Sequence, residues 1–179
     1  MGEITALLVD VSNGDEQALH QVFEQLHGEL KRIAVQRLSQ ASGNTLTPTV
    51  LVNELFLKLS GSETLTLNDR RHFFACAATA MRQIMVDAAR AAKADKRGGQ
   101  LVFVTLTEGA ADDDPEIIAL DQAMDELELV NPGLRELVDL RFFAGLPMEQ
   151  IAELRETSLR SLHREWARAR AFLHAQLQS

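Results

Sequence analysis

The stretch from residue 146 to residue 173 constrains the fold more than any other part of the sequence. Across 159–173 the apolar residues recur at steps of three and four, which is the spacing of one buried stripe on a helix. A shorter apolar pattern precedes it, after Pro147, which suits the first turn of a helix. Thr157 or Ser158 can cap the second helix with a side-chain oxygen. The sequence therefore predicts a short helix, a tight turn and a longer helix.

The longer helix carries basic residues away from its apolar stripe. Arg160, Arg164, Arg168 and Arg170 lie off the stripe and are expected to face outward. A short helix, a sharp turn and an arginine-bearing helix are the parts of a helix-turn-helix, whose second helix enters the major groove of DNA. Two packed helices with exposed arginines also occur in proteins that never touch DNA. The pattern alone therefore leaves both interpretations open.

Helical periodicity continues along the whole chain of 179 residues, and a hydrophobic fraction of 46% is sufficient for a real core. We predict an all-α protein made of two small helical domains. Residues 1–99 form a first domain of four helices, and residues 100–114 form an acidic flexible linker. Residues 115–179 form a second domain, which contains the helix-turn-helix.

Cap residues mark three of the helices in the first domain. Asp15, Thr47 and Asp69 each stand just before an apolar helical pattern, and Pro48 suits the first turn of the third helix. The segment 60–68 between the third and fourth helices is predicted to be a polar loop with both of its leucines exposed or half-buried.

The charge is distributed unevenly. The net charge of -8 is unusual for a nucleic-acid-binding protein. Segment 70–97 nevertheless holds seven basic residues against two acidic ones, whereas segment 108–128 holds nine acidic residues and no basic one. Such asymmetry indicates either separate partners for the two segments or a basic surface that the chain itself masks. In the second case the two domains pack together when free, and that compact state is autoinhibited.

Several other classes of protein are not favoured. Cys76 is the only cysteine, so no disulfide can form within the chain, and we expect a buried, reduced thiol. The five histidines are scattered and not arranged with other ligands as a metal site, so we expect no metal, cofactor or enzymatic activity. We find neither a signal-peptide pattern nor ~18 consecutive apolar residues, and we expect a cytoplasmic protein without membrane contact.

Four groups of motifs follow one another in a specific order and spacing. They are Gly14-Asp15-Glu16 with the helix after it; Leu51-Val52-Asn53-Glu54-Leu55-Phe56-Leu57-Lys58-Leu59; His72-Phe73-Phe74 through Lys96-Arg97-Gly98-Gly99; and Leu140–Leu146 with Ile151-Ala152-Glu153-Leu154 and Arg164-Glu165-Trp166. In this order they resemble the extracytoplasmic-function (ECF) sigma factors of the sigma-70 family. These are the minimal two-domain initiation subunits of bacterial RNA polymerase, and the resemblance covers nearly the whole chain.

The resemblance implies roles for the first domain. It would bind the β′ clamp of core RNA polymerase and open the minus-ten promoter element, and the loop 60–68 would capture a flipped base. The residues implied in polymerase binding are Leu51, Asn53, Glu54 and Lys58. The residues implied in minus-ten binding are Arg70, Arg71, His72 and Arg82. Cationic grooves and stacking surfaces hold single strands, and two arginines at a helix N-terminus oppose its dipole, which indicates a role outside that helix.

The resemblance also implies roles for the second domain. The longer helix would read the minus-thirty-five element, where arginine bidentate to guanine is the commonest specific contact. The implied residues are Ser158, Arg160, Ser161, His163, Arg164 and Arg168. Arg168, like Arg170, resembles a phosphate contact. The implied partners are promoter DNA and core RNA polymerase, through its β′ clamp and β flap. Control by a Ser/Thr kinase or by an anti-sigma factor remains open.

Two departures from the family pattern have consequences. The turn of the helix-turn-helix usually has glycine where this chain has Glu156. The acidic run that often precedes the Leu-Val-x-Glu stretch is replaced by Thr47-Pro48-Thr49-Val50. Phosphorylation of Thr47 or Thr49 would restore negative charge there, since a phosphothreonine adds about -1.5 to -2. The alternative is that Thr47 and Pro48 are an ordinary helix-capping pair.

A stand-alone transcription regulator, with a helical sensor domain and a DNA-binding tail, is the alternative function. It accounts equally well for the second domain but not for the basic, aromatic-led helix after Asp69. Such a regulator should bind duplex DNA alone, usually as a dimer on paired half-sites. A sigma factor should require core polymerase.

Overall fold

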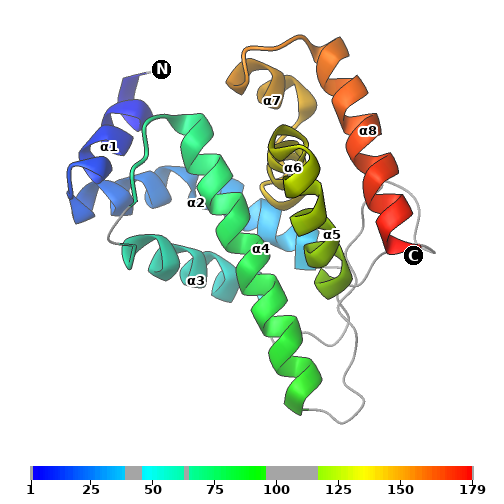
Figure 1. The fold of residues 1–179 in the computed structure, drawn as a ribbon. Helices are drawn as coiled ribbons and strands as arrows, with labels where there is room; N and C mark the ends of the chain where they lie inside the picture. The colour runs from blue at the N-terminus through cyan, green and yellow to red at the C-terminus, as the bar shows by residue number, and fades with distance from the viewer. Residues whose placement is uncertain (1, 39–45, 63–64, 96–116, 179) are drawn as a thin grey trace.

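The computed structural model describes residues 2–38, 46–62, 65–95 and 117–178, and every regular element in these ranges is a helix (Figure 1). The all-α prediction is therefore confirmed. The predicted linker, residues 100–114, lies outside the described residues. The division into two domains remains a prediction.

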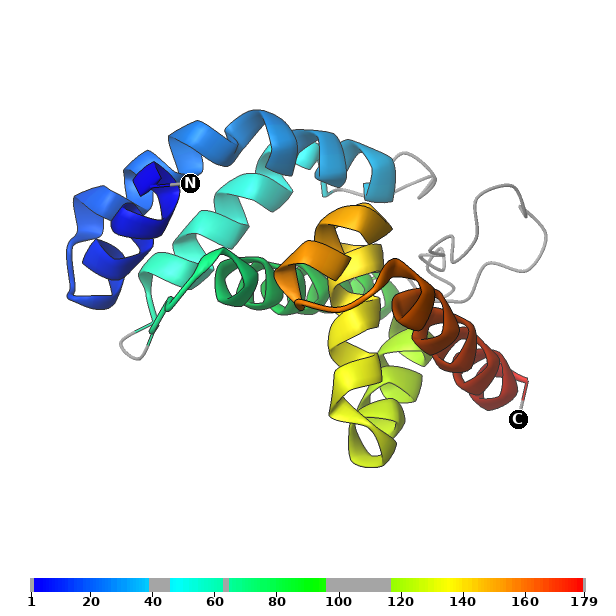
Figure 2. The same cartoon turned by 90° about the horizontal axis from the view of Figure 1, so that it is seen from above.

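Among the described residues, four helices form the N-terminal half. They are α1 Gly2–Ser12, α2 Glu16–Leu38, α3 Pro48–Ser60 and α4 Arg70–Asp95. α2 packs against both α1 and α3, and α4 packs against α3. Figures 1 and 2 show α4 in the middle of the molecule, with α1 to α3 on one side and the C-terminal helices on the other. α4 therefore has a face toward each half of the chain.

The predicted caps begin these helices. Asp15 Oδ1 accepts the backbone N–H two residues along the chain at 2.8 Å. Thr47 Oγ1 and Asp69 Oδ1 accept the N–H three residues along at 3.2 and 2.7 Å. Each bond satisfies one of the donors that a helix N-terminus leaves without an internal partner. Local sequence therefore determines where α2, α3 and α4 start.

The C-terminal half contains five elements. They are α5 Ile117–Val130, α6 Pro132–Val138, the π-helical turn η1 Asp139–Phe143, α7 Met148–Leu154 and α8 Leu159–Leu177. The π-helical geometry follows from the bond of the Ala144 N–H to the Asp139 carbonyl, five residues back, at 2.9 Å. Four of the five side chains in η1 are buried, Asp139 among them. The general helical periodicity of the sequence does not distinguish this π turn from an ordinary α-helical turn.

One continuous core joins the two halves, with buried residues contributed by every helix from α1 to α8. η1 and α5 pack against α4. At Gly145, whose φ is +65°, an added Cβ would lie 3.1 Å from Cγ1 of Ile33 on α2, so the backbone passes unusually close to that side chain. The guanidinium of Arg37, also on α2, lies 4.6 Å from the centre of the Phe142 ring. The described halves therefore pack against each other directly.

Leu67 corrects the prediction for the loop before α4. It was expected to be exposed or half-buried, and it is fully buried. Its backbone N–H donates to Ser12 Oγ at 2.7 Å, and the Ser12 hydroxyl bonds back to the Leu67 carbonyl at 3.0 Å. The loop is thus fastened to the end of α1. The prediction was wrong because this contact joins residues 55 positions apart, and local periodicity cannot predict such a contact.

Candidate functional site

α7 and α8 are joined by a short turn that the capping residue stabilises. Ser158 Oγ accepts the Ser161 N–H at 3.1 Å, so Ser158 rather than Thr157 caps α8. Glu156 has a φ of +51°, in the left-handed region that favours glycine. The place where glycine was expected is therefore a strained position for the residue that occupies it.

One side of α8 packs into the core and the other faces solvent. Leu162, Ala169 and Leu173 are buried, and Trp166 is half-buried. Leu159 was predicted to belong to the buried stripe, but it is 37% exposed because it stands at the first turn, beyond the contact with the core. The stripe that anchors α8 therefore begins at its fourth residue.

The basic residues of α8 are on the free side. Arg160, Arg164, Arg168 and Arg170 are all exposed, as predicted. None of these four forms an ion pair with any of the described residues. Of the other residues implied in minus-thirty-five binding, Ser158 and His163 are exposed, and Ser161 is half-buried. This face of α8 offers positive charge and hydrogen-bond donors without rearrangement.

The arginines that begin α4 are in a different situation, because each has a carboxylate partner. Arg70 lies 3.7 Å from the Glu29 carboxylate and 5.2 Å from the centre of the Phe74 ring. Arg71 binds Glu136 through two hydrogen bonds, of 3.0 and 2.9 Å, and this raises the pKa of Arg71 above its ordinary value. The carboxylate partners of both arginines belong to other helices of the chain itself, and a role of these arginines in binding DNA remains a prediction.

Arg82 is buried further along α4, with 4% of its side chain exposed. It forms an ion pair with Asp121 of α5, and its Nε lies 3.4 Å from Asp139 Oδ1 of η1. Arg90 reaches the same Asp121 at 3.6 Å. The structure therefore places Arg82 beneath the C-terminal helices and not on the open surface expected of a minus-ten contact. Contact of Arg82 with DNA would require these helices to separate.

Asp139 is the acidic centre of this cluster. Its side chain is 4% exposed, and it also lies 2.9 Å from Arg135 Nε. Burial raises its pKa to about 6, against the lowering effect of Arg82 and Arg135. In this cluster, attraction to the arginines favours the ionised carboxylate of Asp139, and burial disfavours it. Burial has the larger effect on the pKa.

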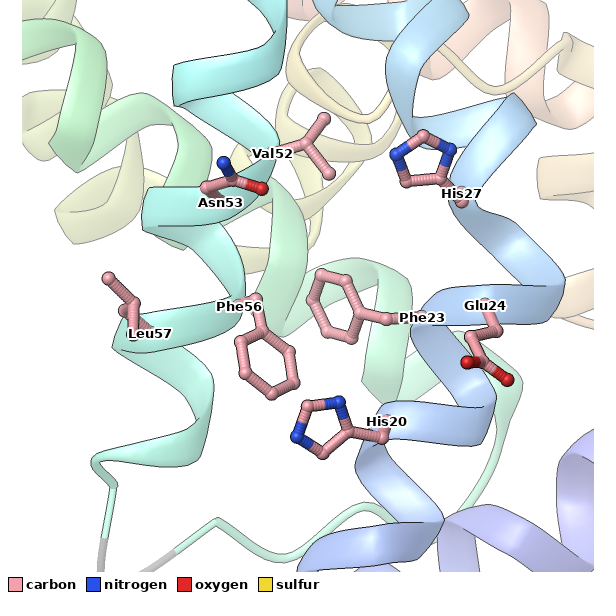
Figure 3. A pocket seen from close by; sticks show the side chains of 8 residues that line it. All are labelled: His20, Phe23, Glu24, His27, Val52, Asn53, Phe56 and Leu57. Atoms are coloured by element: carbon pink, nitrogen blue, oxygen red, sulfur yellow. The ribbon is translucent and has the colours of Figure 1, made fainter.

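A groove of about 650 Å³ runs between α2 and α3 (Figure 3). Its lining residues are His20, Phe23, Glu24, His27, Val52, Asn53, Phe56 and Leu57. Figure 3 shows the Phe56 ring beside His20 and Phe23. The centroid of the Phe56 ring lies 4.5 Å from that of His20 and 5.1 Å from that of Phe23. Leu57 is 60% exposed at the margin. The groove is an apolar surface with a polar and charged rim.

α3 carries the residues that were expected to bind polymerase. Asn53, Glu54 and Lys58 are exposed. Leu51 is only 1% exposed, which corrects its assignment as a surface contact, because it lies one turn from Leu55 on the inner face. Leu57 was not singled out from the sequence. The sequence could have indicated its exposure, because Leu57 does not belong to the buried stripe of α3.

The remaining candidate residues have simpler surroundings. Thr47 and Thr49 are both exposed at the start of α3, so the capping role of Thr47 leaves its side chain accessible. His72 is half-buried, and its Nδ1 lies 3.5 Å from the Asn68 N–H as an acceptor. Cys76 is half-buried and not fully so, and burial raises the pKa of its thiol. In the described ranges, no group of three His, Cys, Asp or Glu residues is placed to hold a metal ion.

The family model described as ECF sigma factor matches residues 1–179 of the chain. No curated protein matches it. Among the helices of the described residues, none has the length and apolar character needed to cross a membrane.

Proposed function

Because the chain belongs to the ECF sigma factor family, and is therefore a sigma factor that directs transcription initiation, we propose specific surfaces for its two partners. α8 reads the minus-thirty-five element of promoter DNA. α3 and the groove beside it bind core RNA polymerase. The observation that carries the proposal is the row of exposed arginines on α8 that have no ion-pair partner among the described residues.

The position of each arginine along α8 separates two kinds of contact. Arg160 and Arg164 lie in the first two turns, and the N-terminal residues of a recognition helix are those that reach base edges. Arg168 and Arg170 lie further along and contact phosphates, which positions the helix without reading sequence. Ser158, Ser161 and His163 complete the proposed base-reading surface.

The polymerase surface combines an apolar centre with a polar rim, as protein interfaces commonly do. Phe56 and Leu57 supply the apolar part, and Asn53, Glu54 and Lys58 surround it. The β′ clamp is the proposed occupant of this surface, and the β flap is the proposed partner of the C-terminal half. Leu57→Asp should therefore weaken binding to core polymerase and leave the α8 surface unchanged.

Transcription from a promoter library, with core polymerase and the purified chain, tests the proposal. Initiation at a defined pair of elements is expected. Arg164→Ala should relax the preference at one base pair of the minus-thirty-five element and cost about 1–3 kcal/mol in binding. Arg168→Ala is the matched control, and it should weaken binding equally for all sequences. Binding to duplex DNA alone as a dimer, with no affinity for core polymerase, would support the stand-alone regulator instead.

We also propose that phosphorylation of Thr47 or Thr49 strengthens binding to core polymerase. Both residues are exposed at the N-terminus of α3, where added negative charge is favourable to the helix dipole, and α3 is the helix of the proposed polymerase surface. A Ser/Thr kinase is then the controlling partner.

A phosphomimetic substitution tests this regulation. Thr49→Asp should raise the affinity for core polymerase, whereas Thr49→Asn, which has the same shape without the charge, should not. Equal affinities for the two variants would remove the support for a kinase. Capture by an anti-sigma factor would then be the partner-based mode of control still to be tested.

A further inference from the structure

Three arginines of α4 meet three carboxylates of the C-terminal half. Arg71 pairs with Glu136 of α6, and both Arg82 and Arg90 pair with Asp121 of α5. The third carboxylate, Asp139 of η1, lies on the other side of Arg82. The contacts follow α4 from its first turn almost to its end. The acidic groups of one half therefore bury Arg82 and pair with the charges of Arg71 and Arg90, whose side chains remain 39% and 55% exposed.

These pairs have the character of an interface more than of a stabilising core. A buried ion pair contributes little net stability, because removing two charges from water offsets most of their attraction. Arg82 Nε and Asp139 Oδ1 are buried 3.4 Å apart, and neither atom makes a hydrogen bond within the described structure. Hydration would satisfy both groups if the halves separated. Separating the halves would therefore cost little in these charged contacts, and its cost would lie in the apolar core that the halves share.

We propose that the pairs of Arg71 with Glu136, and of Arg82 and Arg90 with Asp121, form a latch that holds the free protein in a closed, DNA-masked state. In this state carboxylates occupy the guanidinium groups that would otherwise bind the phosphates of a melted strand. Opening the latch releases the basic face of α4. The inference rests on the role in minus-ten binding that the family resemblance implies for this face of α4, and it adds a means of regulating that role.

Glu136 and Glu165 offer a matched pair for the test. Each glutamate has 26% of its side chain exposed and binds an arginine, at 2.9 and 3.1 Å respectively. Glu136 spans the two halves, whereas Glu165 pairs with Arg155 inside the C-terminal half. Glu136→Gln and Glu165→Gln remove the same charge from similar surroundings. Only the first should open the latch.

The distance between the halves is the first readout. Fluorescent labels on Gln21→Cys of α2 and Gln176→Cys of α8 measure this distance by resonance energy transfer. The full chain carries Cys76→Ala, so that only the two new cysteines are labelled. Glu136→Gln should lengthen the distance and Glu165→Gln should not. Asp121→Asn is a second opening variant, and Arg71→Glu combined with Glu136→Arg should restore the closed distance. Unchanged distances in both Glu136→Gln and Asp121→Asn would overturn the latch.

Binding of a mixed-sequence single-stranded oligonucleotide is the second readout. The dissociation constant should fall by at least about 5-fold in Glu136→Gln, the lower end of typical coupling between sites, and clearly less in Glu165→Gln. A longer distance with equal binding in the two variants would overturn the masking. Core-polymerase binding is measured separately. Its absence, with both latch readouts as expected, would reject the polymerase role and keep the latch.

Discussion

Two arginine-bearing helices of this protein, α4 and α8, have opposite electrostatic surroundings. The arginines of α8 are exposed and have no ion-pair partner among the described residues, whereas Arg71, Arg82 and Arg90 of α4 are paired with carboxylates of the C-terminal half. Both helices show the same kind of sequence pattern, an apolar stripe with arginines. The difference shows that a basic helix is not by itself an available basic surface. Its availability depends on what the rest of the chain places against it.

The largest expected effect comes from removing the buried arginine. Arg82→Ala removes the buried guanidinium that Asp121 and Asp139 share and leaves Asp139 with Arg135 alone, and removing one partner of a buried pair typically costs about 3–5 kcal/mol. Arg164→Ala, on the exposed face of α8, should change the free energy of unfolding by less than about 0.5 kcal/mol. Urea denaturation followed by circular dichroism measures both. If both variants lost the same small amount of unfolding free energy, the burial of Arg82 would not make it more important for stability than the exposed Arg164.

A smaller effect is expected from pH, through Asp139. Its pKa is raised from about 3.8 in the unfolded chain to about 6, chiefly by burial, with Glu128 and Asp121 of α5 also raising it. The charged groups that oppose this rise are Arg82 of α4 and Arg135 of α6. The stabilisation is therefore fully present below the unfolded pKa and is lost as pH rises through about 6, with an upper limit of about 3 kcal/mol.

The variant Asp139→Asn isolates this contribution. The free energy of unfolding of the original protein, minus that of the variant, should be larger at pH 4.5 than at pH 7.5. Because separation of the halves would expose Asp139 and lower its pKa, the closed distance should also be favoured at low pH. A difference that does not vary with pH, or that grows as pH rises, would contradict the assignment of the shift to Asp139.

The smallest expected effect concerns the turn before α8. Glu156→Gly removes the backbone strain of a non-glycine residue at a φ of +51°. Glycine loses more conformational entropy on folding, so the net stabilisation should be about 0.5–1 kcal/mol. Thermal denaturation measures the gain. Glu153→Gly, inside α7, is the control, and it should destabilise by a similar amount. A loss of stability in Glu156→Gly would show that the side chain has a role in the turn.

The parts of the fold that were predicted correctly depend on neighbours along the chain. The caps at Asp15, Thr47, Asp69 and Ser158 join residues two or three positions apart. The outward side of α8 follows from its periodicity in the same way. The errors depend on distant contacts. Leu67 is buried where its loop bonds to the end of α1, and Arg82 is buried where it pairs with Asp121, 39 positions further along the chain.

The sequence by itself determined the helical class, the start of most helices, the exposed arginines of α8 and the membership of the sigma factor family. Hydrogen bonds and side-chain stripes within a few residues are sufficient for these features. Only the tertiary structure decided that Arg82 is buried, that η1 is a π turn carrying a buried Asp139, and that Leu51 belongs to the core. The physical reason is that burial and charge pairing depend on which helices meet. Arg82 and Asp121, 39 positions apart, become partners only when α5 packs on α4.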